Sequence, residues 1–156
     1  AEVTNKLNLR FPEAYMDSED LVLMAKTLKA CDQAVFCEMP FDHTLEAEAM
    51  GGHVNLGDGN TGPRAKDYVC FSLEEVLGLP EIDYTKGRIS VVLTACEELV
   101  KQGEQVVLEI SGPFTILNTL IDLKYIFRGL RKEPEKVNLI FEKLQSEGYK
   151  CKISTL

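Results

Sequence analysis

The sequence lacks any long hydrophobic run among its 156 residues. No apolar stretch approaches the roughly 20 residues that a helix needs to cross a bilayer. The opening segment, AEVTNKLNLR, also lacks the basic region followed by an apolar one that marks a secretory signal. We therefore expect a soluble domain with one hydrophobic core, located in the cytoplasm and without a membrane partner.

Cysteine pairs, an excess of bases and common phosphate-binding motifs are missing as well. The five cysteines form no CxxC motif, so we expect reduced thiols, with Cys31 and Cys37 buried as small hydrophobic residues. The net charge is −8, and residues 1–78 carry fourteen acidic against six basic residues. This balance disfavours nucleic acid, whose phosphates require a basic surface. The glycine-rich motifs of nucleotide-binding loops and the GxSxG motif of esterases are absent.

Apolar residues at helical spacing predict two amphipathic helices. The first begins at Asp17 or Ser18, either of which can cap it, and continues beyond Leu28. The second starts near Gly87 and ends at Gly103. Its apolar stripe consists of Ile89, Val92, Leu93, Cys96, Leu99 and Val100.

Two short apolar runs predict buried strands, at Ala34–Met39 and at Gln105–Ser111. The connection between them is much longer than the dozen residues that a parallel crossover requires. We therefore predict an α/β fold of parallel strands with crossover helices. The loops that follow the two strands, PFDHT (40–44) and SGPFT (111–115), should then lie at the same end of the sheet.

The remaining segments are assigned from capping and turn residues. Thr44 is the expected N-cap of a short helix that ends at Gly51 and Gly52. The loop that follows holds, at most, strands at Val54–Leu56 and Tyr68–Phe71. Further helices are predicted at Ser72–Leu77, from the GPF segment (112–114) to Lys132, and at Pro134–Gly148, before a strand-like tail at residues 149–156.

Loops at the carboxyl ends of parallel strands carry the sites of α/β proteins, so PFDHT and SGPFT are the segments of interest. Asp42 and His43 form either a proton-transfer pair or a loop-capping aspartate beside a solvated histidine. The spacing alone favours the second interpretation. Glu46 and Glu48 face different directions on a short helix, so they do not form the paired carboxylates of a glycosidase, although one of them can point inward.

Metal ligation and partner docking have weaker support in the sequence. His43 and His53 lack the spacing of a metal motif, so we predict no metal site within this chain. Lys124, Arg128 and Lys132 follow one another at steps of four and could dock an acidic partner or substrate. A solvated helix face that complements the helix dipole explains the same stripe and is the favoured interpretation.

Two segments resemble the methylcobamide:coenzyme M-type methyltransferases of the uroporphyrinogen decarboxylase family. PFDHTLEAEAMGGHVNLG (40–57) is similar to that branch's Pro-Phe followed by Thr-Val-Glu-Ala-Glu-Ala-Met/Leu-Gly. Residues 87–137 resemble its helix, strand, Gly-Pro-Phe-Thr turn and Pro-Glu-Lys-Val helix. The resemblance covers roughly residues 11–145. It implies that residues 1–156 form a single partial (β/α)8 TIM-type barrel domain, its amino-terminal half.

The resemblance implies part of a cobalamin-dependent methyltransferase, which moves a methyl group from a methylated corrinoid protein to a zinc-activated thiol such as coenzyme M. Zinc would lower the pKa of the thiol so that the thiolate attacks the methyl group. The branch's zinc ligands, a His-x-Cys pair and a distant Cys, belong to the carboxyl-terminal half, and this sequence has no His-x-Cys. The chain alone is therefore expected to bind neither zinc nor corrinoid and to be inactive. Its implied partners are a corrinoid protein, a small-molecule thiol, and either the missing carboxyl-terminal half or a second copy.

The resemblance also implies site residues. The family's decarboxylase has a catalytic aspartate nine residues before the Gly of an Ala-Leu-Gly segment, and counting back from Gly51 reaches Asp42. Asp42 and His43 are therefore implied as catalytic, with Asp42 pointing into the barrel mouth rather than capping a turn, so that Asp42→Ala should leave folding intact. The implied substrate-binding residues are Phe41, Glu46, Glu48, Gly112, Pro113, Phe114 and Thr115.

Two alternative functions stay open. The first is a uroporphyrinogen decarboxylase of porphyrin biosynthesis, which needs no cofactor, although its amino-terminal Arg-Gln-Ala-Gly-Arg motif is absent. The second is a non-catalytic remnant or assembly module of a split barrel. The family's usual first strand is also missing before the opening helix, and YKCKISTL does not resemble the family's next segment.

Overall fold

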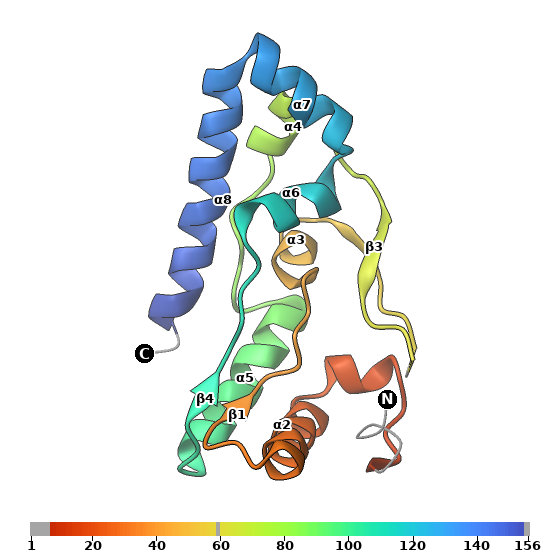
Figure 1. Ribbon diagram of the computed structural model, residues 1–156, viewed down its shortest axis with the longest axis vertical. Helices are drawn as coiled ribbons and strands as arrows, with labels where there is room; N and C mark the ends of the chain where they lie inside the picture. The colour runs from red at the N-terminus through yellow and green to blue at the C-terminus, as the bar shows by residue number, and fades with distance from the viewer. Residues whose placement is uncertain (1–6, 59, 155–156) are drawn as a thin grey trace.

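The computed structural model describes residues 7–58 and 60–154, with side chains as far as residue 147. Helices predominate, with short strands between some of them, and the molecule is elongated (Figure 1). The elements are η1 (Glu13–Met16), α2 (Ser18–Asp32), β1 (Cys37–Glu38), α3 (Leu45–Ala49), β2 (His53–Asn55), β3 (Arg64–Asp67), α4 (Leu73–Leu77), α5 (Gly87–Lys101), β4 (Val106–Val107), α6 (Pro113–Leu120), α7 (Leu123–Lys132) and α8 (Pro134–Ser154).

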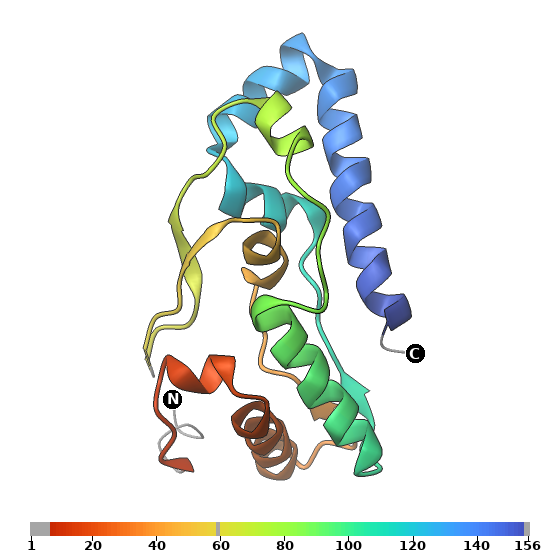
Figure 2. The same ribbon diagram turned by 180° about the vertical axis from the view of Figure 1, so that it is seen from behind.

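The two amphipathic helices predicted from the sequence are confirmed as α2 and α5. Asp17 caps α2, because its carboxylate accepts hydrogen bonds from the backbone N–H groups of Glu19 and Asp20. At the far end of α5, Gly103 adopts φ 83°, a left-handed conformation that glycine reaches without strain. The two helices pack against each other through their apolar faces, at the end of the molecule that holds β1 and β4 (Figures 1 and 2).

Strands β1 and β4 pair in parallel, as predicted, with Cys37 opposite Val106 and Glu38 opposite Val107. Both strands are much shorter than the predicted Ala34–Met39 and Gln105–Ser111. Residues 34–36 follow directly on the left-handed cap of α2 at Gln33, and within the described residues no third strand pairs with this sheet. A strand lacking a neighbour on one side makes few ladder hydrogen bonds, so it is short.

The hairpin lies earlier in the chain than predicted. Strand β2 pairs antiparallel with β3 at Arg64–Asp67, so the predicted second strand at Tyr68–Phe71 is wrong. All four residues of β3 are exposed, which leaves no alternation of buried and exposed positions to mark the strand in the sequence. Cys70 instead forms an isolated parallel bridge with Ile121.

The carboxyl-terminal third is helical for longer than predicted. The single helix expected from the GPF segment to Lys132 is divided at Ile121 and Asp122, because the Asp122 carboxylate accepts from the N–H of Lys124 and starts α7 anew. Helix α8 continues through Gly148 to Ser154, so the strand predicted at residues 149–156 is wrong over residues 149–154. Residues 155 and 156 lie outside the described residues.

One core joins the elements, and α8 packs against α4, α6 and α7 along one side of the molecule. The largest fully buried apolar side chains are Met39, Met50, Val76, Leu99, Ile116, Leu117, Leu120, Ile121, Ile126, Ile140 and Leu144. Cys37 is buried, as predicted, whereas Cys31 is exposed on α2, so its predicted burial is wrong. In the part of the chain that the structure describes, no helix combines the length and apolarity needed to span a membrane.

Candidate functional site

The loop after β1 is closed by Asp42. Its Oδ1 atom accepts a hydrogen bond from the backbone N–H of Thr44 at 2.9 Å and from the Thr44 hydroxyl at 2.6 Å. Asp42 therefore caps a turn. The family resemblance implied that it would not, and that part of the prediction is wrong. Thr44 does precede α3, but its side chain does not cap that helix, because its hydroxyl donates to Asp42 instead.

Arg88, from the first turn of α5, holds this loop to the helix. Its Nη1 donates to Oδ2 of Asp42, and its Nε donates to Oε2 of Glu48 at 2.6 Å. Its Nη2 lies 3.3 Å from the Thr44 hydroxyl. The side chains of Arg88 and Asp42 are only 7% and 10% exposed. One guanidinium thus satisfies two carboxylates and a hydroxyl, which is the kind of arrangement that makes a buried ion pair tolerable.

The electrostatics of this cluster follow from burial and charge together. Burial favours the neutral form of Arg88, but the hydrogen bond to Glu48 and the charge of Asp42 outweigh it and raise the pKa of Arg88 above its usual value. Burial, together with the negative charge of Asp42, raises the pKa of Tyr15. The Arg88 cluster therefore keeps a permanent cation beside the loop, and the Tyr15 hydroxyl keeps its proton at neutral pH.

Sequence reasoning missed Arg88, although a signal was present. Arg88 lies four residues before Val92 and seven before Ala95, and these positions share the buried face of α5. A charged residue on the apolar stripe of a helix requires a buried partner. That requirement points to the acidic loop after β1, which the sequence places at the same end of the sheet as the loop after β4.

Glu46 joins α3, the helix that directly follows the loop after β1, to the loop after β4. Its Oε1 accepts a hydrogen bond from the backbone N–H of Ser111 at 2.9 Å, and both residues are buried. The two predicted loops therefore do meet at the carboxyl end of the sheet. The other oxygen of Glu46, Oε2, and the hydroxyl of Ser111 are buried without a hydrogen-bond partner among the described residues. An unpaired buried polar atom costs on the order of 1–3 kcal/mol, so such atoms mark a place that water or a ligand can complete.

Phe41 and His43 lie on the loop after β1, and Phe114 lies in the first turn of α6. Phe41 and Phe114 are both exposed, at 55% and 46%. The ring of His43 lies 6.3 Å from that of Phe41, centroid to centroid. No hydrogen bond joins the side chains of Asp42 and His43 in the described part of the chain.

The loop after β4 leads directly into α6. Gly112 is the N-cap of this helix, Pro113 is its first residue, and the carbonyl of Thr115 accepts from the Thr119 hydroxyl. A metal centre is not formed by residues 7–58 and 60–154, where no group of three His, Cys, Asp or Glu side chains is suitably placed. His53 is instead paired at 2.6 Å with Asp67 across the exposed β2–β3 hairpin.

Comparison with known proteins gives a consistent family assignment. The family model described as uroporphyrinogen decarboxylase (URO-D) matches residues 5–147. Methylcobamide:CoM methyltransferase MtbA of Methanosarcina acetivorans is 28% identical over 109 residues, covering 68% of this chain and 32% of the relative. Methylated-thiol--coenzyme M methyltransferase of Methanosarcina mazei is 27% identical over 151 residues, covering 91% of this chain and 40% of the relative.

A solved structure, described as methyltransferase from Methanosarcina mazei, has the same fold. Its TM-score is 0.81 at 22% sequence identity, over 94% of this chain and 44% of that chain. The chain thus spans about a third to two fifths of the length of the curated relatives that it matches. The names of those relatives agree with the resemblance of the two sequence motifs to the methyltransferase branch. The chain belongs to the uroporphyrinogen decarboxylase family, and its similarity is to the methyltransferase branch of that family.

Proposed function

We propose that this chain is the amino-terminal part of a cobalamin-dependent methyltransferase, which moves a methyl group from a methylated corrinoid protein to a zinc-activated thiol such as coenzyme M. In this proposal residues 1–156 are a single partial domain, half of a (β/α)8 barrel. The curated relatives are named for methyl transfer from methylcobamide or a methylated thiol to coenzyme M. The chain alone would be inactive, because it spans less than half of those relatives.

The observation that carries the proposal is the hydrogen bond between Glu46 Oε1 and the Ser111 N–H. It joins α3, directly after the loop that follows β1, to the loop after β4, and these strands are parallel. In barrel enzymes the loops at the carboxyl ends of the strands supply the site. The segments after β1 and β4 therefore lie where a barrel enzyme has its active site, and they contact each other there.

Each residue of the two loops has a role in the proposal that follows from its surroundings. Asp42 is tied to Arg88 and Thr44, so we assign it to positioning the loop. The exposed rings of Phe41 and Phe114 would shield a bound methyl donor and its acceptor thiol from water. His43, whose ring lies beside that of Phe41, would take part in proton transfer at that surface.

Zinc does not fit the residues that the structure describes. No suitable set of three ligands is present among them, and the sequence contains no His-x-Cys pair. A catalytic zinc needs about three protein ligands in near-tetrahedral geometry. In the proposed complete enzyme the ligands would come from the part that this chain lacks, and we derive no step of the reaction through the metal.

The proposal also names partners and a setting. The sheet has only two strands within the described residues, and open edges favour pairing with further strands from the missing half or from a second copy. The corrinoid protein and the thiol would meet at the loops. The four cysteines whose side chains the structure describes are free thiols, which suits a reducing, cytoplasmic location.

The test is an assay of the chain joined to the rest of its parent polypeptide. Methylcobalamin and coenzyme M are supplied together. We expect the absorbance of methylcobalamin's methyl–cobalt bond to fall in step with the concentration of free coenzyme M thiol. Decarboxylation of uroporphyrinogen without methyl transfer would instead favour the decarboxylase. If the preparation does neither, the chain is a binding or assembly module.

A further inference from the structure

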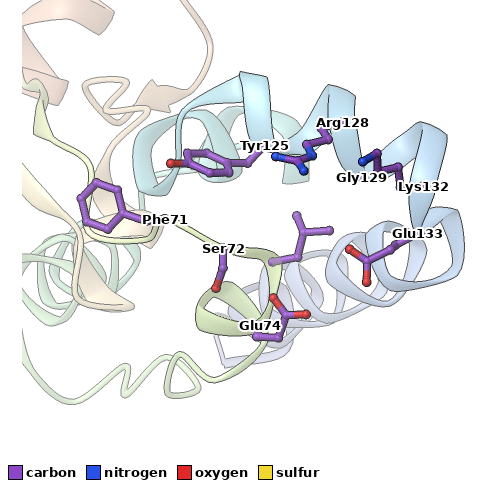
Figure 3. A pocket seen from close by; sticks show the side chains of 9 residues that line it. Phe71, Ser72, Glu74, Tyr125, Arg128, Gly129, Lys132 and Glu133 are labelled. Atoms are coloured by element: carbon purple, nitrogen blue, oxygen red, sulfur yellow. The ribbon is translucent and has the colours of Figure 1, made fainter.

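A groove lies between α4 and α7, at the opposite end of the molecule from β1 and β4 (Figures 1 and 3). Its cavity has a volume of about 200 Å³. Gly129 lets the two helices approach closely, because a Cβ at this position would lie 2.7 Å from Cδ1 of Leu73. Residues from both helices and from the segment just before α4 therefore line one groove. None of the residues proposed for the methyltransferase site lines it.

The unpaired charge in this groove is positive. Glu74 and Glu133 line one side, and both are paired with the Lys136 ammonium group. Arg128 and Lys132 line the other side, and among the described residues neither has an ion pair or hydrogen bond from its side chain. Helix α7 carries four basic residues and no acidic one, although the whole chain has a net charge of −8.

The groove also offers an aromatic contact. The ring of Tyr125 lines it from α7, and Phe71 lies at its edge with 60% of its surface exposed. A large exposed apolar side chain beside a hollow is typical of an interaction surface. The cavity is smaller than the roughly 300–1,000 Å³ of small-molecule sites, so it suits a single side chain better than a cofactor.

We propose that this groove docks an acidic segment of a partner protein. A carboxylate of that segment would pair with Arg128 and Lys132, and an adjacent apolar or aromatic side chain would enter the cavity between Phe71 and Tyr125. Charge complementarity supports an acidic occupant. The small size of the groove, together with the net charge of the chain, disfavours nucleic acid and anionic lipid, which present phosphates over a wide surface. The proposal is independent of the methyltransferase assignment.

The test uses a fluorescein-labelled peptide that alternates pairs of glutamate with phenylalanine, and follows its fluorescence anisotropy. We expect saturable binding that weakens about tenfold with Arg128→Glu, because one charge pair is lost and a repulsion is gained. Arg131→Glu is the matched control. It makes the same change of charge on the same helix, but Arg131 does not line the cavity, so binding should weaken less than about threefold. Circular dichroism checks that both variants keep their helices.

Five results would overturn the proposal. The peptide could fail to bind, or Arg131→Glu could weaken binding as much as Arg128→Glu, which means diffuse attraction only. A peptide with alanine in place of phenylalanine could bind equally well, which leaves the cavity without a role. Light scattering could reveal self-association that Arg128→Glu abolishes, which would make a second copy of the chain the occupant. Finally, phosphatidylserine vesicles could bind with the same dependence on Arg128, which would make a membrane surface the occupant.

Discussion

Arg88 and Asp42 are 46 residues apart in the sequence, yet the Arg88 guanidinium donates a hydrogen bond to Oδ2 of Asp42 in a largely buried setting. Helix α5 supplies the cation, and the segment after β1 supplies two anions, Asp42 and Glu48. The contact therefore fixes the first loop of the proposed site to a helix of the core. A change at either end should alter the stability of the fold and the shape of the loop together.

Removing Arg88 should destabilise the protein strongly. Arg88→Gln leaves the carboxylates of Asp42 and Glu48 without the cation they share, and Asp42 is largely buried. We expect the free energy of unfolding to fall by about 3 kcal/mol. Arg88→Lys keeps the charge but loses the planar fork, so its loss should be about 1–2 kcal/mol. Urea unfolding measures both. Arg131→Gln, an exposed change on α7, should stay within about 0.5 kcal/mol; a similarly small effect of Arg88→Gln would mean that the cluster contributes nothing.

The ion pair changes what we expect of Asp42→Ala. From the family resemblance alone this substitution should leave folding intact, but Asp42 also closes the turn at Thr44 and neutralises Arg88. We now expect a loss of about 2–3 kcal/mol. A double-mutant cycle with Arg88→Gln should give a coupling energy above about 1 kcal/mol, and additive effects would contradict the pairing. A loss of activity in Asp42→Ala indicates a catalytic role only if the variant is still folded under the assay conditions.

The sequence predicts those parts of the fold that local patterns determine. Helices α2 and α5 follow from apolar spacing and capping residues. The parallel pairing of β1 with β4 follows from the length of the crossover. The extent of each strand was not predictable, because it depends on neighbours that a local pattern cannot reveal. Helix α8 passes through Gly148 because one glycine costs only about 1 kcal/mol relative to alanine in a helix.

The candidate site was predictable to a similar degree. The two loops, and their meeting at one end of the sheet, follow from the topology. Which of Glu46 and Glu48 points inward is decided by the distant N–H of Ser111, so the residues of α3 alone cannot show it. Arg88 could have been found, since a charge on the buried stripe of α5 needs a partner, but only the structure identifies Asp42 and Glu48 as that partner.

The cysteines should differ sharply in reactivity. Burial raises the pKa of the Cys37 and Cys70 thiols and shields them from reagents. Cys31 is exposed on α2, so a reagent can reach it in the folded protein. In a Cys151→Ala background at pH 8, a disulfide reagent such as dithionitrobenzoate should label one thiol rapidly and the others only after unfolding. Cys31→Ala should abolish the rapid phase. Equally fast labelling of Cys37 in folded protein would contradict the structure.

Acid should weaken the turn before α5. A hydrogen bond from Lys86 and further bonds from Thr85 lower the pKa of Asp83 from 3.8 to about 2. Because the pKa is lower in the folded state, the stabilisation is complete above about pH 4 and is lost as the pH falls through 2. Wild type should therefore be more stable than Asp83→Asn at pH 5, and the difference between their urea midpoints should shrink by pH 2. A constant difference would mean that the charge of Asp83 is not involved.

Glu46 provides the sharpest test of the buried junction between the two loops. Glu46→Ala removes the acceptor for the Ser111 N–H and leaves a cavity, so we expect a loss of about 2–3 kcal/mol in urea unfolding. Glu46→Gln keeps an amide oxygen for that N–H and replaces a buried carboxyl group by a neutral amide, so we expect no loss, or a gain of up to about 1 kcal/mol.

The exposed Glu142→Gln on α8 is the matched control for this change of charge, and its effect should stay within about 0.5 kcal/mol. Ser111→Ala removes only a hydroxyl that lacks a partner among the described residues, so it too should be nearly neutral. If Glu46→Gln is as damaging as Glu46→Ala, then Oε2 of Glu46 has a partner that requires a carboxylate. A bound water or ligand would then have to occupy the junction, because an amide group in the same position satisfies every contact that the described residues make with Glu46.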